Sequence, residues 1–335
     1  MKVLLYLENK SSVSVSGIGR ALAHQEEALK ENGIEVTFDP KDTYDIAHIN
    51  SYGPKSYHLL KKLKRKGIKV VVHGHSTHED FRESFRLWKL MAPFYNHMMN
   101  RMYTRADLII TPTPYSKKLI ENYKNVTAEV KAISNGIKLE DYQYDTKYID
   151  EFKERFNITN EKVVIGVGFY FKRKGIDDFF EVARQMKDVK FIWFGYLNKI
   201  LTTSYILKAI KNKPDNVILP GYIKGNVIKG AFLYSSCMFF PTREETEGIV
   251  ALEALATKLT LVTRDIGVYE GWLENNVNCY KGKTNEEFIS LIRKSIDEDN
   301  TSIHENGYKV VEERTLKKVG ELLKKEYTKL LDKKD

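Results

Sequence analysis

The chain has 335 residues, of which 42% are hydrophobic and 30% charged, and its formal net charge is +9. This length fits two domains of about 150 residues each, and the composition is typical of a globular protein and excludes general disorder. The apolar run at residues 3–7 ends at Glu8, and no run approaches the roughly 18 residues that span a bilayer. We therefore expect neither a signal peptide nor a membrane-spanning helix.

Net charge and cysteine content limit the possible partners and the expected redox environment of the chain. The excess of basic residues favours a polyanionic partner, which could be nucleic acid, anionic lipid or a phosphorylated substrate, and charge alone does not choose among them. Cys237 and Cys279 have neither the spacing of metal ligands nor that of a disulfide framework, so we expect buried thiols in a reducing cytoplasm.

The first half of the chain alternates short β-rich runs with amphipathic segments. A first strand is predicted at residues 2–7, followed by a glycine turn with Gly17 and a helix through Leu29. Further strands are predicted at 46–49, 70–72 and 108–110. Such alternation indicates a parallel sheet that helices cover on both faces.

A second series of strands follows a polar stretch. It is predicted at residues 163–165, 191–194, 217–219, 238–240 and 259–262. We therefore predict an α/β fold of two doubly wound domains, at 1–140 and 162–307, joined by a linker at 141–161 that holds a short helix. The last residues, 308–335, are predicted as an amphipathic helix, which could cross back to the first domain. Ligands of such sheets bind beyond the carboxyl ends of the strands, so a cleft between the domains is the expected site.

The most informative stretch is residues 245–253, which read E-T-E-G-I-V-A-L-E directly after a predicted strand. Glu245 and Glu253 frame Gly248, where a strand gives way to a helix. Carboxylates can bind sugar hydroxyls, and the free N–H groups of a helix start can face a diphosphate. The plain alternative is a pair of solvated glutamates, since short motifs often occur by chance.

Two other turns carry candidate ligand groups. Arg173 and Lys174 lie between a predicted strand and helix, where fixed cations could neutralise a departing diphosphate; a solvated basic turn is the alternative. The turn around Gly17 could bring the backbone close to a phosphate or sugar, or it could be a plain tight turn. It is not a G-x-G-x-x-G dinucleotide motif.

Taken together and in this order, these features resemble the retaining nucleotide-sugar glycosyltransferases of family four, which have the GT-B fold. The resemblance covers nearly the whole chain. It is carried by Gly17, Asn135-Gly136-Ile137, Arg173-Lys174-Gly175, Pro241, Glu245 and Glu253. The opening residues 1–8 and 16–20 are similar, more narrowly, to the bacterial glycolipid synthases that add a second hexose to monoglucosyl-diacylglycerol.

The resemblance implies roles for single residues. Glu253 would bind the ribose hydroxyls of the nucleotide, Glu245 would lie near the donor hexose, and Lys174 would bind the diphosphate. Backbone N–H groups of the new helix would face phosphate and sugar, from Gly248, Ile249 and Val250. The arginine that usually accompanies the lysine is absent, because Gly168 or Phe169 stands at its place, and we expect Arg173 to supply that charge.

The resemblance also implies a histidine at the donor sugar and a mechanism without a protein base. His73, after a predicted strand, would approach the sugar from the first domain, although a strand-end histidine is more often structural and His75 or His78 could be confused with it. The departing phosphate oxygen would take the acceptor's proton. We expect no metal, since no Asp-x-Asp motif is present, and no cofactor besides the UDP-hexose donor.

Two basic segments are candidates for contact with an acceptor or an anionic membrane. The first is a predicted helix with Lys61, Lys62, Lys64, Arg65 and Lys66. The second is an aromatic and methionine stripe from Phe81 to Met102, interrupted by Pro93, in which Arg82, Arg86 and Trp88 lie. For the first segment an ordinary surface helix packed on its sheet is the default, and for the second the residues alone favour core packing. With the resemblance both can hold, because one face can pack on the core while the rim contacts lipid.

The sequence thus predicts a retaining hexosyltransferase that moves a hexose, most simply glucose, from a UDP-hexose to a membrane glycolipid such as monoglucosyl-diacylglycerol. It would lie peripherally on the cytoplasmic face of the membrane. A transferase with a cell-wall or polysaccharide acceptor is the close alternative. A nucleic-acid-binding α/β protein is the non-enzymatic one, and it lacks any nucleic-acid-binding motif, so no nucleic acid is expected. The donor epimer, the linkage and the oligomeric state stay open.

Overall fold

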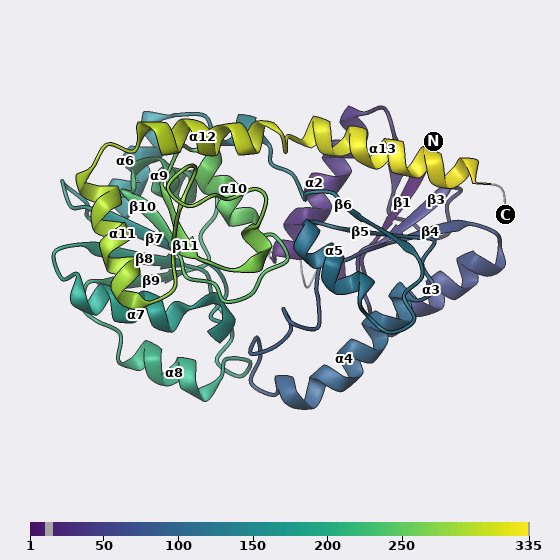
Figure 1. Cartoon of the computed structure of the whole chain (residues 1–335), viewed down its shortest axis with the longest axis horizontal. Coiled ribbons are helices and arrows are strands. Elements are labelled where there is room, and N and C mark those ends of the chain that lie inside the picture. Colours follow the sequence, from purple (N-terminus) through teal and green to yellow (C-terminus); the bar gives the residue numbers. More distant parts are fainter. Residues whose placement is uncertain (11–15, 334–335) are drawn as a thin grey trace. The chain divides into compact units, whose positions relative to one another are not determined.

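The computed structural model describes residues 1–10 and 16–333, which divide into two compact units (Figure 1). The first unit comprises Met1–Phe81, Lys89–Lys138 and Glu313–Asp335, and the second comprises Arg82–Trp88 and Leu139–Glu312. Each unit contains one six-stranded sheet in which every neighbouring pair of strands is parallel. The predicted α/β class with two doubly wound sheets is confirmed.

In the first unit the strand order is β2-β1-β3-β4-β5-β6. The strands are β1 (Lys2–Tyr6), β2 (Glu35–Thr37), β3 (Ile46–Ile49), β4 (Lys69–His73), β5 (Leu108–Thr111) and β6 (Glu129–Ala132). The helices are α2 (Gly17–Glu31), α3 (Pro54–Arg65), α4 (Trp88–Tyr103), α5 (Pro114–Glu121) and α13 (Leu316–Asp332). The central strands β3, β4 and β5 are mainly apolar and almost completely buried because helices cover them on both faces.

The end of the chain differs from the single helix predicted for 308–335. Helix α12 (Thr301–Glu312) ends before Thr315, whose side chain caps a new helix, α13, by accepting a hydrogen bond from the N–H of Lys318. Helix α12 belongs to the second unit and α13 to the first. Helix α13 packs against α2. Gly320 permits this close approach, since a Cβ there would lie 2.0 Å from the carbonyl oxygen of Ala28.

In the second unit the strand order is β12-β11-β10-β7-β8-β9. The strands are β7 (Val163–Val167), β8 (Lys190–Phe194), β9 (Val217–Gly221), β10 (Cys237–Phe240), β11 (Leu261–Arg264) and β12 (Tyr280–Gly282). The helices are α6 (Thr146–Phe156), α7 (Ile176–Gln185), α8 (Ser204–Lys211), α9 (Asn226–Tyr234), α10 (Ile249–Ala256), α11 (Asn285–Asp297) and α12, with short 3₁₀ turns η1 (Leu139–Tyr142), η2 (Lys172–Lys174) and η3 (Gly267–Tyr269). The strand order reverses between β7 and β10, where doubly wound sheets bind ligands.

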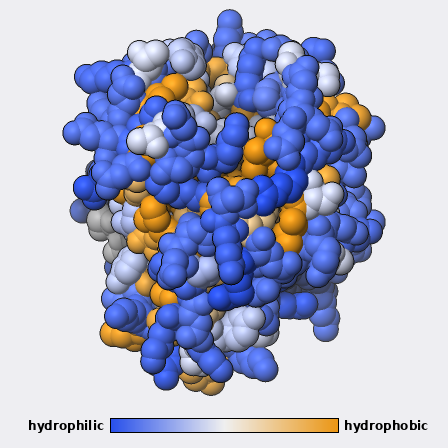
Figure 2. All heavy atoms as spheres, turned by 90° about the vertical axis from the view of Figure 1, so that its left-hand side faces the viewer, coloured by the Kyte–Doolittle hydropathy of each residue, from blue (hydrophilic) through white to orange (hydrophobic). Residues whose placement is uncertain are grey.

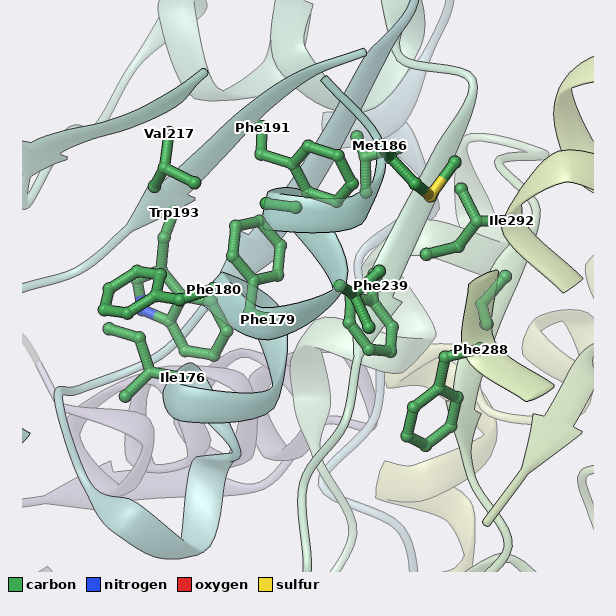
Figure 3. Packing of buried hydrophobic residues seen from close by; sticks show 14 of the residues in the cluster. Ile176, Phe179, Phe180, Met186, Phe191, Trp193, Val217, Phe239, Phe288 and Ile292 are labelled. Carbon is green, nitrogen blue, oxygen red and sulfur yellow. The ribbon is translucent and has the colours of Figure 1, made fainter. Parts of the chain in front are cut away.

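Aromatic side chains fill the core of the second unit (Figure 3). The ring of Phe179, on α7, lies edge-on to Trp193 at a centroid distance of 5.1 Å and to Phe191 at 5.2 Å. All three side chains are completely buried. This packing fixes α7, and with it the turn that precedes α7, against the sheet.

Two segments that were predicted as a linker and as part of the first domain belong to the second unit instead. Residues 141–161, predicted as a linker, contain α6, which packs so closely on α9 that a Cβ on Gly230 would lie 1.9 Å from the carbonyl oxygen of Tyr148. Residues 82–88 also belong there, and the Phe85 ring contacts Phe171 at 5.0 Å. Both segments are therefore packed parts of the second unit and not flexible linkers.

The face of the molecule in Figure 2 is mainly hydrophilic, with hydrophobic side chains in small separate groups. In residues 1–10 and 16–333, none of the helices has the length and apolar character needed to cross a membrane.

Candidate functional site

The candidate site of the second unit lies where the strand order reverses. Strand β7 leads into η2, which carries Lys174, and the neighbouring strand β10 leads into the loop that carries Glu245. Because parallel strands end at the same edge of the sheet, the two side chains meet, and Nζ of Lys174 forms an ion pair with Oε1 of Glu245. The sequence predicted both residues, and the structure brings them together.

Glu245 is a buried carboxylate that is kept charged by its neighbours. It is 5% exposed, and its Oε1 accepts a hydrogen bond of 2.9 Å from the hydroxyl of Thr242 and lies 3.7 Å from Nη1 of Arg173. Burial alone would raise the pKa of Glu245, but the charges of Lys174 and Arg173 and the hydrogen bonds hold it below its ordinary value. The carboxylate is therefore ionised at neutral pH.

Backbone contacts fasten the η2 turn to the loop after β10. Gly175 has a φ of 72°, and a Cβ there would lie 2.3 Å from the carbonyl oxygen of Pro241, so only glycine fits. The N–H of Arg243 donates to the carbonyl of Arg173 at 2.6 Å. The hydroxyl of Thr242 lies 3.2 Å from the same carbonyl. We name Arg173, Lys174, Thr242 and Glu245 the donor cluster.

A partly buried charge network adjoins the donor cluster. Arg243 donates to both carboxylate oxygens of Asp177, at 2.9 and 3.1 Å, and to Asp178 at 2.6 Å. Arg264 donates to Asp178 at 2.6 Å. Burial raises the pKa of Asp178, although both arginines oppose this. The network joins α7, the loop after β10 and the end of β11, so it holds the donor cluster in one geometry.

Arg173 is largely buried, and two hydrogen bonds orient its guanidinium. Its Nε donates to the hydroxyl of Ser84 at 2.8 Å, and its Nη1 donates to the carbonyl of Glu244 at 3.0 Å. These contacts hold the guanidinium beside Glu245. The expectation that Arg173 supplies the missing family charge stays a prediction.

Helix α10 supplies the remaining groups. Gly248 precedes it with a φ of 83°, which lets the chain turn abruptly from the loop into Ile249 and Val250. The first N–H groups of a helix have no acceptor within it. Glu253, further along α10, is 2% exposed and accepts a hydrogen bond of 2.7 Å from the hydroxyl of Tyr142.

Sequence reasoning missed Thr242, Arg243 and Tyr142. Tyr142 precedes its partner by 111 residues, so no local spacing links them. The acidic pair at the start of α7 was the only local signal for a basic partner such as Arg243.

In the first unit, the predicted residues Gly17 and His73 differ in how strongly the fold constrains them. Gly17 begins α2, and a Cβ there would contact no described atom within 4 Å, so packing does not require glycine. His73 ends β4, is 4% exposed and stacks on His75 at a centroid distance of 3.9 Å. His78 instead stacks on Tyr123.

Comparison with known proteins identifies the family. The model described as "Glycosyltransferase Family 4" matches residues 40–141, and the one described as "Glycosyl transferases group 1" matches residues 148–310. The chain is 52% identical over 332 residues to a protein of Acholeplasma laidlawii named processive diacylglycerol alpha-glucosyltransferase, covering 99% of both chains. This chain belongs to the family 4 glycosyltransferases. It is an enzyme, as the sequence predicted.

Solved structures support the fold of this glycosyltransferase. Sucrose-phosphate synthase from Thermosynechococcus elongatus superposes with a TM-score of 0.83 at 14% identity, over 98% of this chain and 99% of that one. Anabaena Alr3699/HepE, solved in complex with UDP-glucose, superposes with a TM-score of 0.75 at 15% identity, over 98% of this chain and all of its own. These likenesses confirm the predicted GT-B fold.

The basic candidates of the glycosyltransferase lie on the surface of two different units. The cations of α3 are exposed and, with Arg105, line a hollow of the first unit: Lys61, Lys64 and Arg65 face it, and Lys62 and Lys66 lie outside it. Arg82 and Arg86 are exposed and Trp88 is half-buried, and all three belong to the second unit. The assignment of these three to the first domain was therefore wrong.

The predicted aromatic and methionine stripe is core. Met99 and Met102 are completely buried in the first unit, and α4 continues through Pro93 instead of ending there. Pro93 lies on the exposed side of the helix, where water can bind the carbonyl that loses its partner. The exposed apolar side chains of α4 are others, namely Leu90 (77% exposed), Met91 (48%) and Phe94 (64%).

Proposed function

We propose that this glycosyltransferase moves glucose from UDP-glucose to a membrane glycolipid such as monoglucosyl-diacylglycerol, with retention of configuration at the transferred carbon. The observation that carries the proposal is the donor cluster at the strand-order reversal of the second unit, where two cations face one buried carboxylate. The name of the Acholeplasma laidlawii relative supports the lipid acceptor, and the UDP-glucose complex of the Anabaena protein supports the donor.

The diphosphate would bind to Lys174, Arg173 and the start of α10. Without a donor, Glu245 neutralises Lys174, and both side chains are nearly buried, at 7% and 14% exposure. A diphosphate brings at least two negative charges, so it can share Lys174 with Glu245. The N–H groups at Ile249 and Val250 add donors and the positive end of the helix dipole.

The nucleoside and the hexose would contact the two glutamates of α10 and its preceding loop. Glu253 would accept hydrogen bonds from the ribose hydroxyls, and Tyr142, already bonded to Oε1, would hold the carboxylate in position. Glu245 would face the hexose beside Gly248, whose lack of a side chain leaves space next to that carboxylate. Carboxylate acceptors suit sugar hydroxyls because charged hydrogen bonds are the stronger ones.

The proposed reaction forms one bond and breaks one. The acceptor hydroxyl oxygen bonds to the anomeric carbon on the face that UDP leaves, and the bond between that carbon and the phosphate oxygen breaks. The acceptor's proton passes to the departing phosphate oxygen, so no protein base is needed. Lys174 and Arg173 would stabilise the negative charge that develops on UDP.

The acceptor's membrane would be met by exposed groups of the first unit. Leu90, Met91 and Phe94 lie one helical turn or less apart on α4, so they form one exposed apolar surface. The cations of α3 could bind anionic lipid headgroups, each contributing about 1 kcal/mol near such a surface. Binding would then be peripheral, reversible and weakened by salt.

Mass analysis of products tests the reaction. The chain would be incubated with UDP-glucose or UDP-galactose and with monoglucosyl-diacylglycerol or soluble oligosaccharide. We expect a diglycosyl lipid from UDP-glucose, with the new linkage in the α configuration by NMR. A product only on oligosaccharide would reject the lipid acceptor. If neither acceptor is glycosylated and an oligonucleotide raises the melting temperature of the chain, the proposed transfer from UDP-hexose is rejected.

Vesicle flotation tests the membrane contact. A Leu90→Ser/Phe94→Ser variant should float less with phosphatidylglycerol vesicles than the parent chain, since apolar burial is lost. Leu322→Ser/Leu331→Ser, which alters two exposed leucines on α13 of the same unit, is the matched control and should float like the parent. Equal flotation of both variants would contradict the assignment of the apolar surface on α4.

A further inference from the structure

A strip of buried polar side chains crosses the sheet of the first unit below α2 and α13. His48 lies on β3 and His73 ends β4, and the register pairs His48 with Val71. Residues two apart in a strand share a face, so His48 and His73 point to the same side of the sheet. Both rings are buried, and their centroids lie 5.1 Å apart.

Hydrogen bonds connect this strip to the last helix. Nδ1 of His48 lies 2.5 Å from the hydroxyl of Tyr327 on α13, and Nε2 of His48 lies 3.2 Å from Nδ1 of His73. Tyr327 is completely buried. The hydrogen bonds therefore run from Tyr327 on the last helix through His48 to His73, the histidine expected to contact the substrate.

The Tyr327 hydroxyl fixes the direction of these bonds. In the described ranges His48 is its hydrogen-bond partner, so the hydroxyl hydrogen requires Nδ1 of His48 as its acceptor. Asn50 donates its amide N–H to Oε1 of Gln25 at 3.0 Å. The Gln25 amide nitrogen lies 2.8 Å from Nδ1 and 3.3 Å from Nε2 of His48, so it does not distinguish the two ring nitrogens.

Hydrogen counting then sets the state of both rings. If Nδ1 of His48 accepts, its hydrogen is on Nε2 and is donated to Nδ1 of His73. His73 must then carry its own hydrogen on Nε2. The opposite arrangement would leave the buried Tyr327 hydrogen without an acceptor, which costs more than a satisfied network.

Burial keeps these rings neutral. It lowers the pKa of His73 to about 3, although the adjoining Asn135 side chain opposes the shift. It also lowers the pKa of His48 and of His75 well below 6.5, and the neighbouring rings add to the effect. A neutral ring has one N–H donor, whose position depends on the tautomer.

We propose that Tyr327 and His48 are positioning residues, which hold His73 in the tautomer that offers its Nε2 hydrogen to a substrate oxygen. Nε2 of His73 is buried beside Asn135 and makes no hydrogen bond of ordinary geometry in the described part of the chain. We name Tyr327, His48 and His73 the histidine relay. The relay is a property of the first unit alone; its effect on transfer rests on the function proposed above.

The direct test is the tautomer itself, in the full chain without any substrate. Two-bond ¹H–¹⁵N correlation spectra of ¹⁵N-histidine-labelled protein at pH 7 distinguish protonated from unprotonated ring nitrogens. We expect His48 and His73, each assigned by its glutamine variant, to be neutral with the hydrogen on Nε2. A hydrogen on Nδ1 of His73, or a charged His48, overturns the proposal whatever the enzyme transfers.

The Tyr327→Phe variant tests the consequence. It removes one hydrogen bond to His48 and keeps the ring, so we expect mixed tautomers at His48 and a kcat lower by about 2- to 12-fold. UDP affinity should not change, because Tyr327 belongs to the first unit and the residues proposed for UDP to the second. An unchanged kcat, or a parallel loss of UDP affinity, overturns the proposal.

Control variants distinguish an effect on the relay from a general effect on folding, and one outcome distinguishes the relay from the proposed reaction. Tyr280→Phe removes a buried hydroxyl bonded to Asn300 in the second unit and should leave the His48 tautomer unchanged. His48→Gln retains a donor toward His73 and should transfer faster than His48→Leu; equal rates overturn the proposal. If the tautomers are as expected and the wild-type chain transfers no glucose, the relay is supported and the proposed function is rejected.

Discussion

The donor cluster of the second unit and the histidine relay of the first stabilise polar groups in opposite ways. In the donor cluster a buried carboxylate stays charged because Lys174 and Arg173 compensate it. In the relay the hydrogen-bond partners are neutral groups, and burial keeps His48 and His73 neutral, as it does the adjoining His75. The difference matches the contacts proposed for each unit, since a diphosphate requires cations, whereas the substrate oxygen proposed to meet His73 requires one directed hydrogen bond.

The largest effect should come from the charge of the donor cluster. Lys174→Met removes the cation and keeps the length of the chain, and loss of one well-placed transition-state donor lowers kcat by about 100- to 1,000-fold. Transfer of radiolabelled glucose measures it. Lys172→Met is the matched control, since Lys172 lies in the same turn but pairs with the half-exposed Glu83. Equal losses in both variants would show that the turn, and not Lys174, matters.

The next largest effect concerns the nucleoside. Glu253→Gln should weaken UDP binding by about 10- to 150-fold, as expected for losing charged hydrogen bonds of about 1.5–3 kcal/mol. Tyr142→Phe, which only releases the carboxylate, should weaken it less. Titration calorimetry with UDP measures both. Glu305→Gln, at an exposed ion pair with Lys258, serves as control. Unchanged UDP affinity in Glu253→Gln would exclude the ribose contact.

The relay's neutrality predicts a dependence of stability on pH. His73 takes up a proton near pH 6.5 when unfolded and only near pH 3 when folded, so the unfolded state gains protons first and stability falls as pH drops below about 6.5. Each buried histidine contributes up to about 1.4 kcal/mol per pH unit. Urea unfolding at pH 7, 6 and 5 measures the slope.

The His75→Gln variant isolates the share of that slope that comes from His75, which stacks on His73 of the relay. Glutamine can still donate to Asn50, as His75 does at 2.7 Å, but does not titrate. Its stability should fall less steeply with acid than that of the parent chain. His24 and His304, whose pKa values burial also lowers, keep contributing in both proteins. Identical slopes would contradict the neutral state of His75.

The smallest effect should come from the Thr242 hydroxyl. Thr242→Val keeps the shape and removes one hydrogen bond to Glu245, so transfer should slow by about 2- to 12-fold. The melting temperature would fall slightly, since Glu245 retains both cations. A loss as large as that of Lys174→Met would mean that the hydroxyl itself contacts substrate.

The sequence was most informative where local patterns coincide with tertiary structure. The long apolar runs at β4, β7 and β8 predicted central strands correctly because such strands are buried on both faces. The three-residue strands β2 and β12 at the sheet edges were missed, since their residues carry no sustained apolar run. The division of the last helix depends on Thr315 and on the sheet that α13 covers, which periodicity does not reveal.

The candidate site was predictable in part for the same reason. Lys174 and Glu245 follow neighbouring strands, so topology alone places them together. Whether either binds the donor stays a prediction. The roles of Tyr142 and Arg243 and the contacts among Tyr327, His48 and His73 were not predicted, because each contact joins segments remote in sequence; His48 and Tyr327 are 279 residues apart.

The division of the chain has a consequence for synthesis. The first unit takes residues 313–335 from the far end of the chain, and α13 contributes Leu316, Val319, Leu323 and Tyr327 to its core. While the ribosome is still translating the second unit, the sheet of the first unit therefore lacks one of the helices that cover it. A nascent chain stopped after Lys138 should remain open to protease, and supplying the last helix as a separate peptide should close it.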